Sequence, residues 1–409
     1  MPVLPDEDLI DQDHYASQGP PHAALRRLRA DAPISWHEMP DDTGFWAITK
    51  YKDVFAISLD QKTFSSARAG VILRTWKQDE YEPQKGMLIN LDPPEHTHYR
   101  RLVSLGFSGR MIRRLEEHVR SITTDIIDQV AHAGECDFVS SISVELPLRV
   151  IVELVGVPLA DRHRVLQWSN QMLAYDDPEY QLDPDTPKIA AAELFMYANE
   201  LAAERLEHPR EDLVSELMHG EVEGHRLSLA EFNSFFLLLL VAGNETTRNL
   251  ISGGLLALIE HPEERARLQA DPSLLPTAVE EMLRWVTPVN LFRRTATRDV
   301  EVRGQKIREG DKVVLFYASA NRDEEIFPEA DRFDVGRQPN DHLAFGIGPH
   351  FCLGANLARL EIRVMFEELL RRLPDITLAG PVERLRSNFI NGIKRMPVRF
   401  TPERARARA

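Results

Sequence analysis

The sequence contains only two cysteines among its 409 residues, Cys136 and Cys352, and no C-x-x-C pair. Two distant cysteines provide neither a disulfide framework nor the ligand spacing of a zinc site, and such low usage is typical of a reducing compartment. Long apolar runs are absent as well, since the longest, residues 235–242, is far shorter than the roughly 20 residues that cross a bilayer. We therefore expect no membrane span.

Positive charge is in deficit, because 49 Lys and Arg stand against 64 Asp and Glu, a formal net charge of -15. This balance argues against nucleic acid as the main partner. Residues 1–22 are acidic where a secretion signal would be basic and then apolar, so we expect a cytoplasmic protein. No repeat, low-complexity linker or boundary divides the chain, which predicts one domain over residues 1–409, and we expect a monomer.

The strand-like segments are short. Residues 34–36 and 45–48 flank a turn-like stretch at 40–44, which predicts a β-hairpin. Two further strand-like segments, 299–302 and 313–317, are separated by glycine-containing turns. Strands of this length cannot form the whole core, so helices must provide the rest.

The helical patterns are longer. Ser228 and Glu231 form a capping box, which predicts a helix from there to about residue 260, and its apolar middle indicates burial. Further helices are predicted from residue 276 to just before Pro288 and over 358–373. Long helices with a few strands collected to one side predict a mainly α, α+β fold, a helix-rich domain with small β-sheets.

The segment 345–354 places three glycines and a proline around Cys352, directly before the last predicted helix. Glycines at this density let the backbone approach a flat ligand, and a helix N-terminus favours thiolate over thiol. A thiolate is the proximal ligand that haem iron needs if an O–O bond is to be cleaved. The pattern therefore predicts Cys352 as a haem ligand, and the alternative is a buried, small apolar side chain.

Residues 242–247 interrupt the buried helix with Gly243 and then with an acid beside a hydroxyl, Glu245 and Thr246. A glycine costs about 1 kcal/mol in a helix interior, and a buried carboxylate needs a partner. Oxygen activation provides a reason, because dioxygen must receive two protons before its bond breaks, and a locally distorted turn with both groups can relay them. The alternative is that Thr246 bonds to its own helix and Glu245 pairs with Arg248.

These segments resemble the cytochrome P450 family from about residue 88 to the C-terminus. The family's haem-binding signature F-x-x-G-x-x-x-C-x-G is matched by Phe345, Gly348, Cys352 and Gly354. Its A-G-x-[DE]-T-T motif is matched by residues 242–247. The resemblance implies the cytochrome P450 fold, haem b (iron protoporphyrin IX) bound through Cys352 and lined by the other signature positions, and oxygen activation by Glu245 and Thr246.

The resemblance also implies structural residues. Glu281 and Arg284 lie one helical turn apart, which alone is ordinary surface chemistry. They match the family's E-x-x-R motif, and residues 331–333 match the downstream segment that completes a buried triad. The implied triad is Glu281, Arg284 and Arg332, and it would hold the Cys352 loop in register.

Haem carries two propionates, which call for cationic or hydrogen-bonding partners. By position in the family's pattern, the resemblance implies that these partners are His96, Arg100, Arg294 and His350. The neighbouring His98 and Arg293 leave the choice at two of these positions open.

The expected substrate pocket is mostly apolar, which predicts a hydrophobic substrate. The residues expected to line it are Leu238, Val241, Ala242, Val289, Asn290, Leu291, Phe389 and Ile390, with part of residues 69–87. Asn290 is expected to orient a polar group. Core packing is the alternative for each of these positions.

Electrons must come from another protein, because no flavin or nicotinamide fingerprint is present. Residues 100–120 contain six arginines and only two acids, Glu116 and Glu117. We hypothesise that part of this cluster docks an acidic ferredoxin, itself served by a separate reductase, near the thiolate side. The alternative is a solvated helix face.

The sequence thus predicts a haem-thiolate monooxygenase that inserts one atom of O2 into an unactivated C–H bond of a lipid, terpenoid or sterol-like molecule. Residues 242–249 and 391–394 most resemble bacterial family members that act on sterol side chains and methyl-branched lipids. Two alternatives remain: a peroxide-driven peroxygenase, against which Glu245 and Thr246 argue, and a non-catalytic haem-binding or sensor protein.

Overall fold

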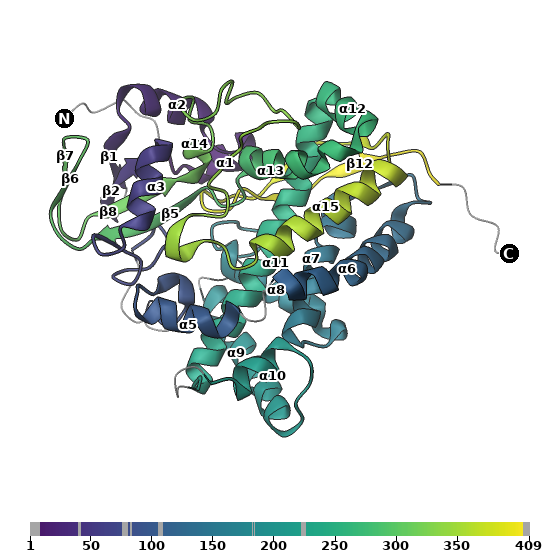
Figure 1. The fold of residues 1–409 in the computed structure, drawn as a ribbon, viewed down its shortest axis with the longest axis horizontal. Coiled ribbons are helices and arrows are strands. Elements are labelled where there is room, and N and C mark those ends of the chain that lie inside the picture. The colour runs from purple at the N-terminus through teal and green to yellow at the C-terminus, as the bar shows by residue number, and fades with distance from the viewer. Residues whose placement is uncertain are drawn as a thin grey trace.

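The computed structural model describes residues 9–39, 42–75, 81, 84–104, 109–181, 183, 185–221 and 226–403, with the backbone alone for 109–114. Helices account for most of these residues, and the largest sheet lies at one end of the molecule with the N-terminal helices (Figure 1). The predicted mainly α, α+β fold class is confirmed.

The α-helices of the described residues are α1 (Gln12–Gln18), α2 (His22–Asp31), α3 (Tyr51–Leu59), α5 (Glu95–Ser104), α6 (Gly109–Val130), α7 (Glu145–Val155), α8 (Arg162–Leu173), α9 (Thr186–Glu207), α10 (Leu213–His219), α11 (Leu229–Glu260), α12 (Pro262–Ala270), α13 (Leu275–Val286), α14 (Tyr317–Ala320) and α15 (Ala355–Arg372). Short helical turns are η2 (Leu88–Asn90), η4 (Val139–Ser143), η5 (Leu159–Asp161), η6 (Pro272–Leu274) and η7 (Gly348–His350).

The strands are β1 (Ile34–Met39), β2 (Asp42–Ile48), β3 (Phe64–Ser65), β4 (Glu135–Asp137), β5 (Leu291–Ala296), β6 (Val300–Val302), β7 (Gln305–Ile307), β8 (Lys312–Phe316), β9 (Thr377–Leu378), β10 (Glu383–Arg384), β11 (Ile393–Arg395) and β12 (Pro397–Arg399). They form a five-stranded sheet in the order β1-β2-β8-β5-β3, a three-stranded sheet β4-β12-β9, and the pairs β10-β11 and β6-β7.

The predicted hairpin is confirmed. Strand β1 pairs antiparallel with β2, with Trp36 opposite Trp46, and the two indoles meet edge to face. Residues 40 and 41 of the predicted turn lie outside the described residues. The two later strand predictions are also confirmed, as β6 and β8 begin and end within one residue of the expected positions.

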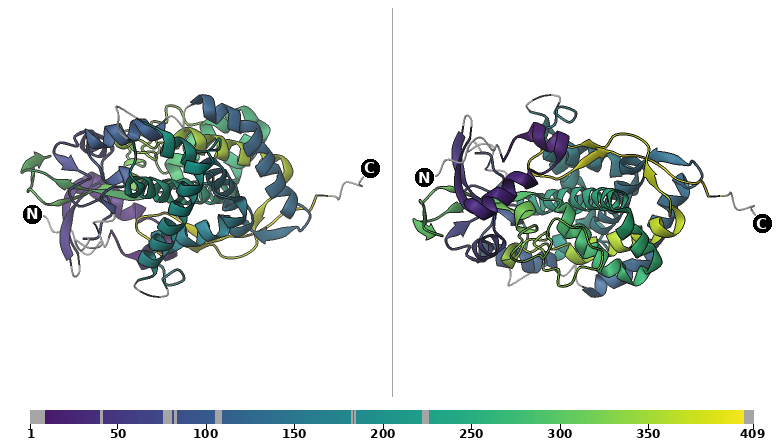
Figure 2. Two further views of the ribbon diagram at one scale, coloured as in Figure 1. Left: turned by 90° about the horizontal axis from the view of Figure 1, so that it is seen from below. Right: turned by 90° about the horizontal axis from the view of Figure 1, so that it is seen from above.

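Helix α11 runs through the middle of the molecule in both views of Figure 2. It begins after Ser228, whose side chain accepts from the backbone of Glu231 while the Glu231 carboxylate accepts from the Ser228 backbone. The predicted capping box, length and burial are therefore confirmed. The predicted distorted turn is wrong, because the helix is α-helical throughout. The glycine at position 243 is explained by packing instead, because a Cβ there would stand only 3.0 Å from the Ile151 side chain of α7.

Helices α13 and α15 pack against α11 and carry the remaining motif residues. A Cβ at Gly254 of α11 would stand 3.0 Å from Met282 Sδ of α13 and 3.1 Å from Phe366 Cζ of α15, so the glycine permits a close three-helix contact. The largest apolar core surrounds this contact and extends to α6 and α7. Both helices begin and end within a few residues of the predicted positions.

No helix among the described residues is both long and apolar enough to cross a lipid bilayer.

Candidate functional site

A cavity of about 250 Å³ lies between α5, α11, the start of α15 and β5. Its wall brings together eight of the residues predicted for the haem site: His96, Arg100, Thr246, Arg294, Phe345, His350, Cys352 and Gly354. These residues come from four separate parts of the chain, so the fold assembles a site that only the sequence motifs had linked.

Cys352 lies in the loop between η7 and α15. Its backbone N–H donates to the carbonyl of Phe345 at 2.9 Å, and the guanidinium of Arg359 lies 4.6 Å from the centre of the Phe345 ring. Burial raises the pKa of the Cys352 thiol, and the backbone N–H of Gly354 with Arg100 and Arg359 acts in the opposite direction without outweighing it. A bound metal cation would lower this pKa and favour the thiolate.

The glycines of this loop serve two different purposes. Gly348 has φ +75, and a Cβ there would approach Leu59 Cδ2 of α3 to 2.9 Å, so it permits the loop to pack against that helix. Gly348 itself does not line the cavity. Gly354 does, and a Cβ at that position would meet no atom within 4 Å, as expected for backbone that faces open space.

The polar end of the cavity holds two imidazoles and two guanidiniums. The rings of His96 and His350 lie 4.3 Å apart between centres. Burial, followed by the neighbouring arginines, lowers the pKa of His96 to about 4 and that of His350 to about 2, so both rings are neutral. Both ring nitrogens of His96 and Nε of Arg294 are buried without a hydrogen-bond partner.

Unpaired buried N–H groups beside guanidiniums are what two carboxylates would satisfy, so these residues fit the propionates of a haem. His98 does not line the cavity. Arg293 does not line it either, because its guanidinium donates to the carbonyl of Arg74 at 3.3 Å and to Thr295 Oγ1 at 3.4 Å. The geometry therefore favours His96 and Arg294 where the sequence had left a choice.

The acid and the alcohol of α11 face different surroundings. Thr246 lines the cavity, and its hydroxyl donates to the carbonyl of Ala242 at 3.0 Å. Glu245 is buried away from the cavity wall, where it pairs with Arg248 and accepts from Asn249 Nδ2 at 3.3 Å. Both contacts are those of the alternative that the sequence had left open, so the arrangement by itself assigns neither residue a role in proton transfer.

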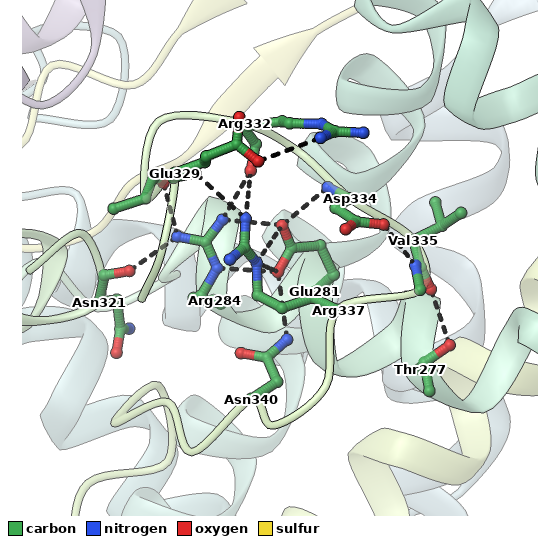
Figure 3. A network of polar contacts seen from close by, with 12 residues as sticks. Thr277, Glu281, Arg284, Asn321, Glu329, Arg332, Asp334, Val335, Arg337 and Asn340 are labelled. Atoms are coloured by element: carbon green, nitrogen blue, oxygen red, sulfur yellow. Dashed lines mark hydrogen bonds and ion pairs between the residues drawn. The ribbon is translucent and has the colours of Figure 1, made fainter. Parts of the chain in front are cut away.

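The implied triad needs one correction, which Figure 3 makes visible. Glu281 and Arg284 form a fully buried pair, with Arg284 Nε and Nη2 at 2.8 and 2.7 Å from the two carboxylate oxygens. The third member is Arg337, whose Nε lies 3.1 and 3.2 Å from the same oxygens. The prediction that Arg332 completes the triad is wrong, because its side chain is 54% exposed and pairs with Glu329 at 3.2 Å.

Arg332 contributes through its backbone. Its carbonyl accepts from Arg284 Nη2 at 3.1 Å and from Arg337 Nη2 at 2.8 Å. Because the Arg332 carbonyl is turned inward, its side chain points to solvent. The arginine that matches the motif therefore contributes only its backbone, and the guanidinium of the triad comes from Arg337. No signal in a single sequence separates the two arginines, because both lie in an irregular loop without periodicity.

The triad connects to the cysteine loop through two asparagines. Asn340 Nδ2 donates to Glu281 Oε2 at 3.1 Å. Asn321 offers its backbone carbonyl to Arg284 Nη1 at 2.9 Å, while its side-chain oxygen accepts from the backbone of Leu343 at 2.7 Å. The network thus holds the chain just before Phe345.

Three of the residues predicted for the substrate pocket are on the cavity wall. Leu238, Ala242 and Val289 line the cavity. Five predicted residues lie in the core instead and do not line it: Val241, Asn290, Leu291, Phe389 and Ile390. None of the described residues of 69–87 lines it, and 76–80 and 82–83 lie outside the described residues. The sequence missed several apolar lining residues: Leu88, Ile89, Val103, Leu239 and Phe292.

The arginine-rich segment is divided by the structure. Arg100 lines the cavity and is one of the residues proposed for the propionates. Arg120 of α6 pairs with Glu116 and with Glu367 of α15, the latter at 2.8 Å. The side chains of Arg110, Arg113 and Arg114 lie outside the described residues.

Comparisons with known proteins agree with this geometry. The cytochrome P450 family model matches residues 181–374. A steroid C26-monooxygenase of Rhodococcus jostii is 42% identical over 98% of this chain and 86% of that protein. A methyl-branched lipid omega-hydroxylase of Mycobacterium tuberculosis is 44% identical over 92% of this chain and 90% of that protein.

Solved structures show the same relationship. A Mycobacterium marinum cytochrome P450 in complex with pseudoionone superposes with a TM-score of 0.90 at 41% identity, covering 98% of this chain and all of that one. A Bacillus megaterium structure in complex with testosterone superposes with a TM-score of 0.86 at 32% identity, covering 95% and 99%. Identity of this degree over nearly the whole chain means that the protein is a monooxygenase of the cytochrome P450 family.

Proposed function

We propose that this cytochrome P450 hydroxylates the branched apolar end of a lipid such as a steroid side chain or a methyl-branched chain, with haem b bound through Cys352. We further propose that residues 1–409 form a single domain. The observation that carries it is the convergence of Cys352, two imidazoles and two guanidiniums on the wall of one mostly apolar cavity. Haem iron, when bound there, supplies the binding and reductive cleavage of dioxygen.

The chain's own residues would hold that group. Cys352 would provide the sulfur ligand, and Gly354 leaves room for a flat ring beside the loop. His96, Arg100, Arg294 and His350 would bind the propionates by hydrogen bonds and charge. Phe345 packs behind the loop and is itself covered by Arg359.

Replacing the sulfur tests this arrangement. Cys352→Ser is expected to abolish the thiolate-type carbon monoxide spectrum of the reduced protein. Cys136→Ser is the matched control, because Cys136 lies in β4 and does not line the cavity, so its spectrum stays unchanged. An unchanged spectrum in Cys352→Ser would refute the assignment.

Thr246 and Glu245 are proposed to deliver protons for oxygen activation. The Thr246 hydroxyl is on the cavity wall and can exchange its bond to Ala242 for a donor bond into the cavity by rotation about χ1. The neighbouring Glu245 carboxylate can pass a proton to this hydroxyl once its ion pair with Arg248 opens. Thr246→Ala is expected to keep NADPH oxidation and to divert most electrons from product to hydrogen peroxide, and full coupling would refute this role.

The substrate class is proposed from the wall and from the relatives. Helix α11 contributes Leu238, Leu239 and Ala242 to the cavity wall, and the first polar side chain that follows them on this face is Thr246. We therefore propose that the reacting end of the substrate is apolar. The steroid and methyl-branched lipid activities printed for the relatives agree with such an end.

A spectral binding screen over fatty acids, terpenoids, sterols and aromatic acids, followed by product analysis, tests the class. Two matched pairs sharpen it: a steroid with its branched side chain against the same nucleus without it, and a methyl-branched fatty acid against the straight chain. Preference for the branched member in both pairs supports the proposal, and preference for aromatic acids refutes it.

Electrons are proposed to come from an acidic ferredoxin with a separate reductase. Helix α6, which carries most of the arginine-rich segment, lies along α15, the helix that follows Cys352, and is tied to it by Arg120–Glu367 and Arg363–Glu116 at 2.8 Å each. Charge reversal at Arg110, Arg113 and Arg114 is expected to slow reduction by ferredoxin at low salt. Unchanged reduction rates under those conditions would reject this docking site.

A further inference from the structure

Arg322, which follows α14, is a buried arginine whose guanidinium has almost no acceptor. The residue is only 8% exposed, and its Cζ lies 3.8 Å from the centre of the Trp285 ring. Among the described residues its side chain has one hydrogen bond, a long one of 3.4 Å from Nη1 to Asp331, and its Nε is buried without a partner. Burial, followed by the charge of Arg284, lowers the pKa of Arg322 to about 9. A buried cation is normally paired, so this guanidinium lacks the acceptor that its position requires.

A second guanidinium without an acceptor belongs to Arg384 of β10. Its side chain has no hydrogen bond or ion pair with the described residues. It lies against Gly19, where a Cβ would stand 3.4 Å from Arg384 Cζ. Burial lowers the pKa of Arg384, and Glu260, an acid whose charge acts on it, forms no ion pair with it. By contrast, Arg395 on the paired strand β11 pairs with Glu383 at 2.7 Å, so the lack of an acceptor is particular to Arg384.

His22, the first residue of α2, brings the two guanidiniums together. Burial lowers the pKa of His22 well below the usual 6.5, and the charges of Arg322, Arg29 and Arg384 follow as further causes in that order. The imidazole is therefore neutral, and its Nδ1 is buried without a hydrogen-bond partner. No side chain caps α2 at this end, so the free N–H groups of its first turn add to the positive field. Figure 1 shows α2 beside α14, with which it is in contact.

The acids around this cluster are already engaged with other cations. Glu324 lies 2.7 Å from Arg29 Nη2 and 3.8 Å from Arg26 Nε. Asp331 pairs with Arg26 and reaches Arg322 only through the long contact of 3.4 Å. The described part of the chain therefore leaves two positive charges and a neutral imidazole in one place with almost no acceptor between them.

Donors that converge in this way match a phosphate-type oxyanion, because guanidiniums bind its oxygens through paired N–H groups and a helix N-terminus adds further donors. We propose that Arg322, Arg384 and His22 bind a small phosphate-type anion at the start of α2. Arg384 is partly exposed, so the anion can enter from its side. None of the three residues lines the cavity, so the site is separate from the proposed haem site and does not depend on the proposed lipid hydroxylation.

An anion at this place would connect three distant parts of the chain: the start of α2, strand β10, and the loop after α14. The loop also carries Asn321, whose backbone carbonyl accepts from Arg284 of the triad. A ligand that binds only the folded protein stabilises it by mass action. The Tm of the wild type is therefore expected to rise with phosphate concentration at constant ionic strength.

Isothermal titration calorimetry of the haem-loaded protein with inorganic phosphate, at constant ionic strength, tests the site without reference to activity. The wild type is expected to bind one phosphate per chain with saturable heat. Arg384→Gln is expected to weaken this binding about tenfold or more, because a charge-assisted hydrogen bond is lost. Arg395→Gln is the matched control on the paired strand and leaves the Kd unchanged, because Arg395 is already paired with Glu383.

A wild-type protein that shows no saturable phosphate binding overturns the proposal, as does an equal Kd in the wild type and in Arg384→Gln. Arg322→Gln is expected to abolish binding, and if that variant fails to fold, the partly exposed Arg384 decides. Glycerol phosphate, titrated in parallel, separates the two sources of the anion: tighter binding of the ester assigns the site to a phosphorylated molecule, and tighter binding of inorganic phosphate assigns it to the free ion. A protein that binds phosphate but hydroxylates no lipid keeps this site and rejects only the proposed function.

Discussion

Replacing Arg337 by alanine is expected to destabilise the protein far more than replacing Arg332. Arg337 is almost fully buried, and besides Glu281 its guanidinium donates to the carbonyls of Pro328 at 2.7 Å, Glu329 at 3.2 Å and Arg332 at 2.8 Å. Its removal leaves the Pro328 carbonyl without a donor, takes one donor each from the Glu329 and Arg332 carbonyls, and leaves Glu281 with less of its compensating charge. Breaking a buried pair in this way costs about 3–5 kcal/mol.

Arg332→Ala removes little by comparison. Its side-chain partner Glu329 is 71% exposed, so solvent screens the pair, and the expected loss is about 0–1 kcal/mol. The Arg332 carbonyl that serves the buried network is backbone and remains after substitution. Arg337→Lys is expected to fall between the two variants, because an ammonium keeps the charge but lacks the fork that reaches Glu281 and the carbonyls together.

The assay is urea unfolding of the haem-loaded proteins, followed by far-ultraviolet circular dichroism and by the Soret band. Because the triad holds the chain before Phe345 through Asn340 and Asn321, Arg337→Ala is also expected to release haem faster. Equal losses of stability in Arg332→Ala and Arg337→Ala would refute the reasoning, as would an Arg337→Ala protein that loses under about 1 kcal/mol.

Three further predictions follow from individual contacts. Burial would raise the pKa of Glu280, but hydrogen bonds from His342 and Arg359 outweigh burial and lower this pKa to about 2. The Glu280 carboxylate therefore stabilises the protein above the usual pKa of 4.5, and this stabilisation is lost as the pH falls from 4.5 toward 2. The difference in Tm between wild type and Glu280→Gln is expected to shrink in that window, and a constant difference would contradict this. Ala242→Phe is expected to weaken substrate binding at least about tenfold in spectral titrations, whereas Phe389→Leu, in the core, leaves the Kd nearly unchanged; equal effects would contradict the lining. Arg294→Gln is expected to speed haem transfer to apomyoglobin about tenfold or more, since a charge-assisted bond is lost, and Arg293→Gln much less; a faster transfer in Arg293→Gln would reverse the assignment.

Much of the fold was predictable because the signals are local. Helix α11 begins at its capping box and ends before Pro262, as the caps alone predict. The same holds for α13, whose start and stop lie beside Pro276 and Pro288. The grouping of the proposed haem-site residues around one cavity was predictable for a different reason: matched motifs identify these residues jointly, even though they lie in distant parts of the chain.

The pocket was predicted less well because side-chain direction was not considered residue by residue. Val289 and Phe292 line the cavity, whereas Asn290 and Leu291 between them do not, so a contiguous segment cannot line it as a whole. On α11 the lining positions repeat every three or four residues, and Val241 falls off that face. Arg337 was missed because which arginine of an irregular loop turns inward is decided by tertiary contacts alone.

The two acids beside the cavity differ in whether a nearby cation offsets the cost of burying them. Glu245 has Arg248 one turn further along its own helix, so this ion pair is available wherever α11 forms. Glu361 has Val364 and Met365 at the equivalent positions on its helix, α15, so no charge there offsets the cost of burying its carboxylate. Glu361 contacts the cavity and Glu245 does not, so the acid that matches the motif must open its ion pair with Arg248 before it can deliver protons as proposed.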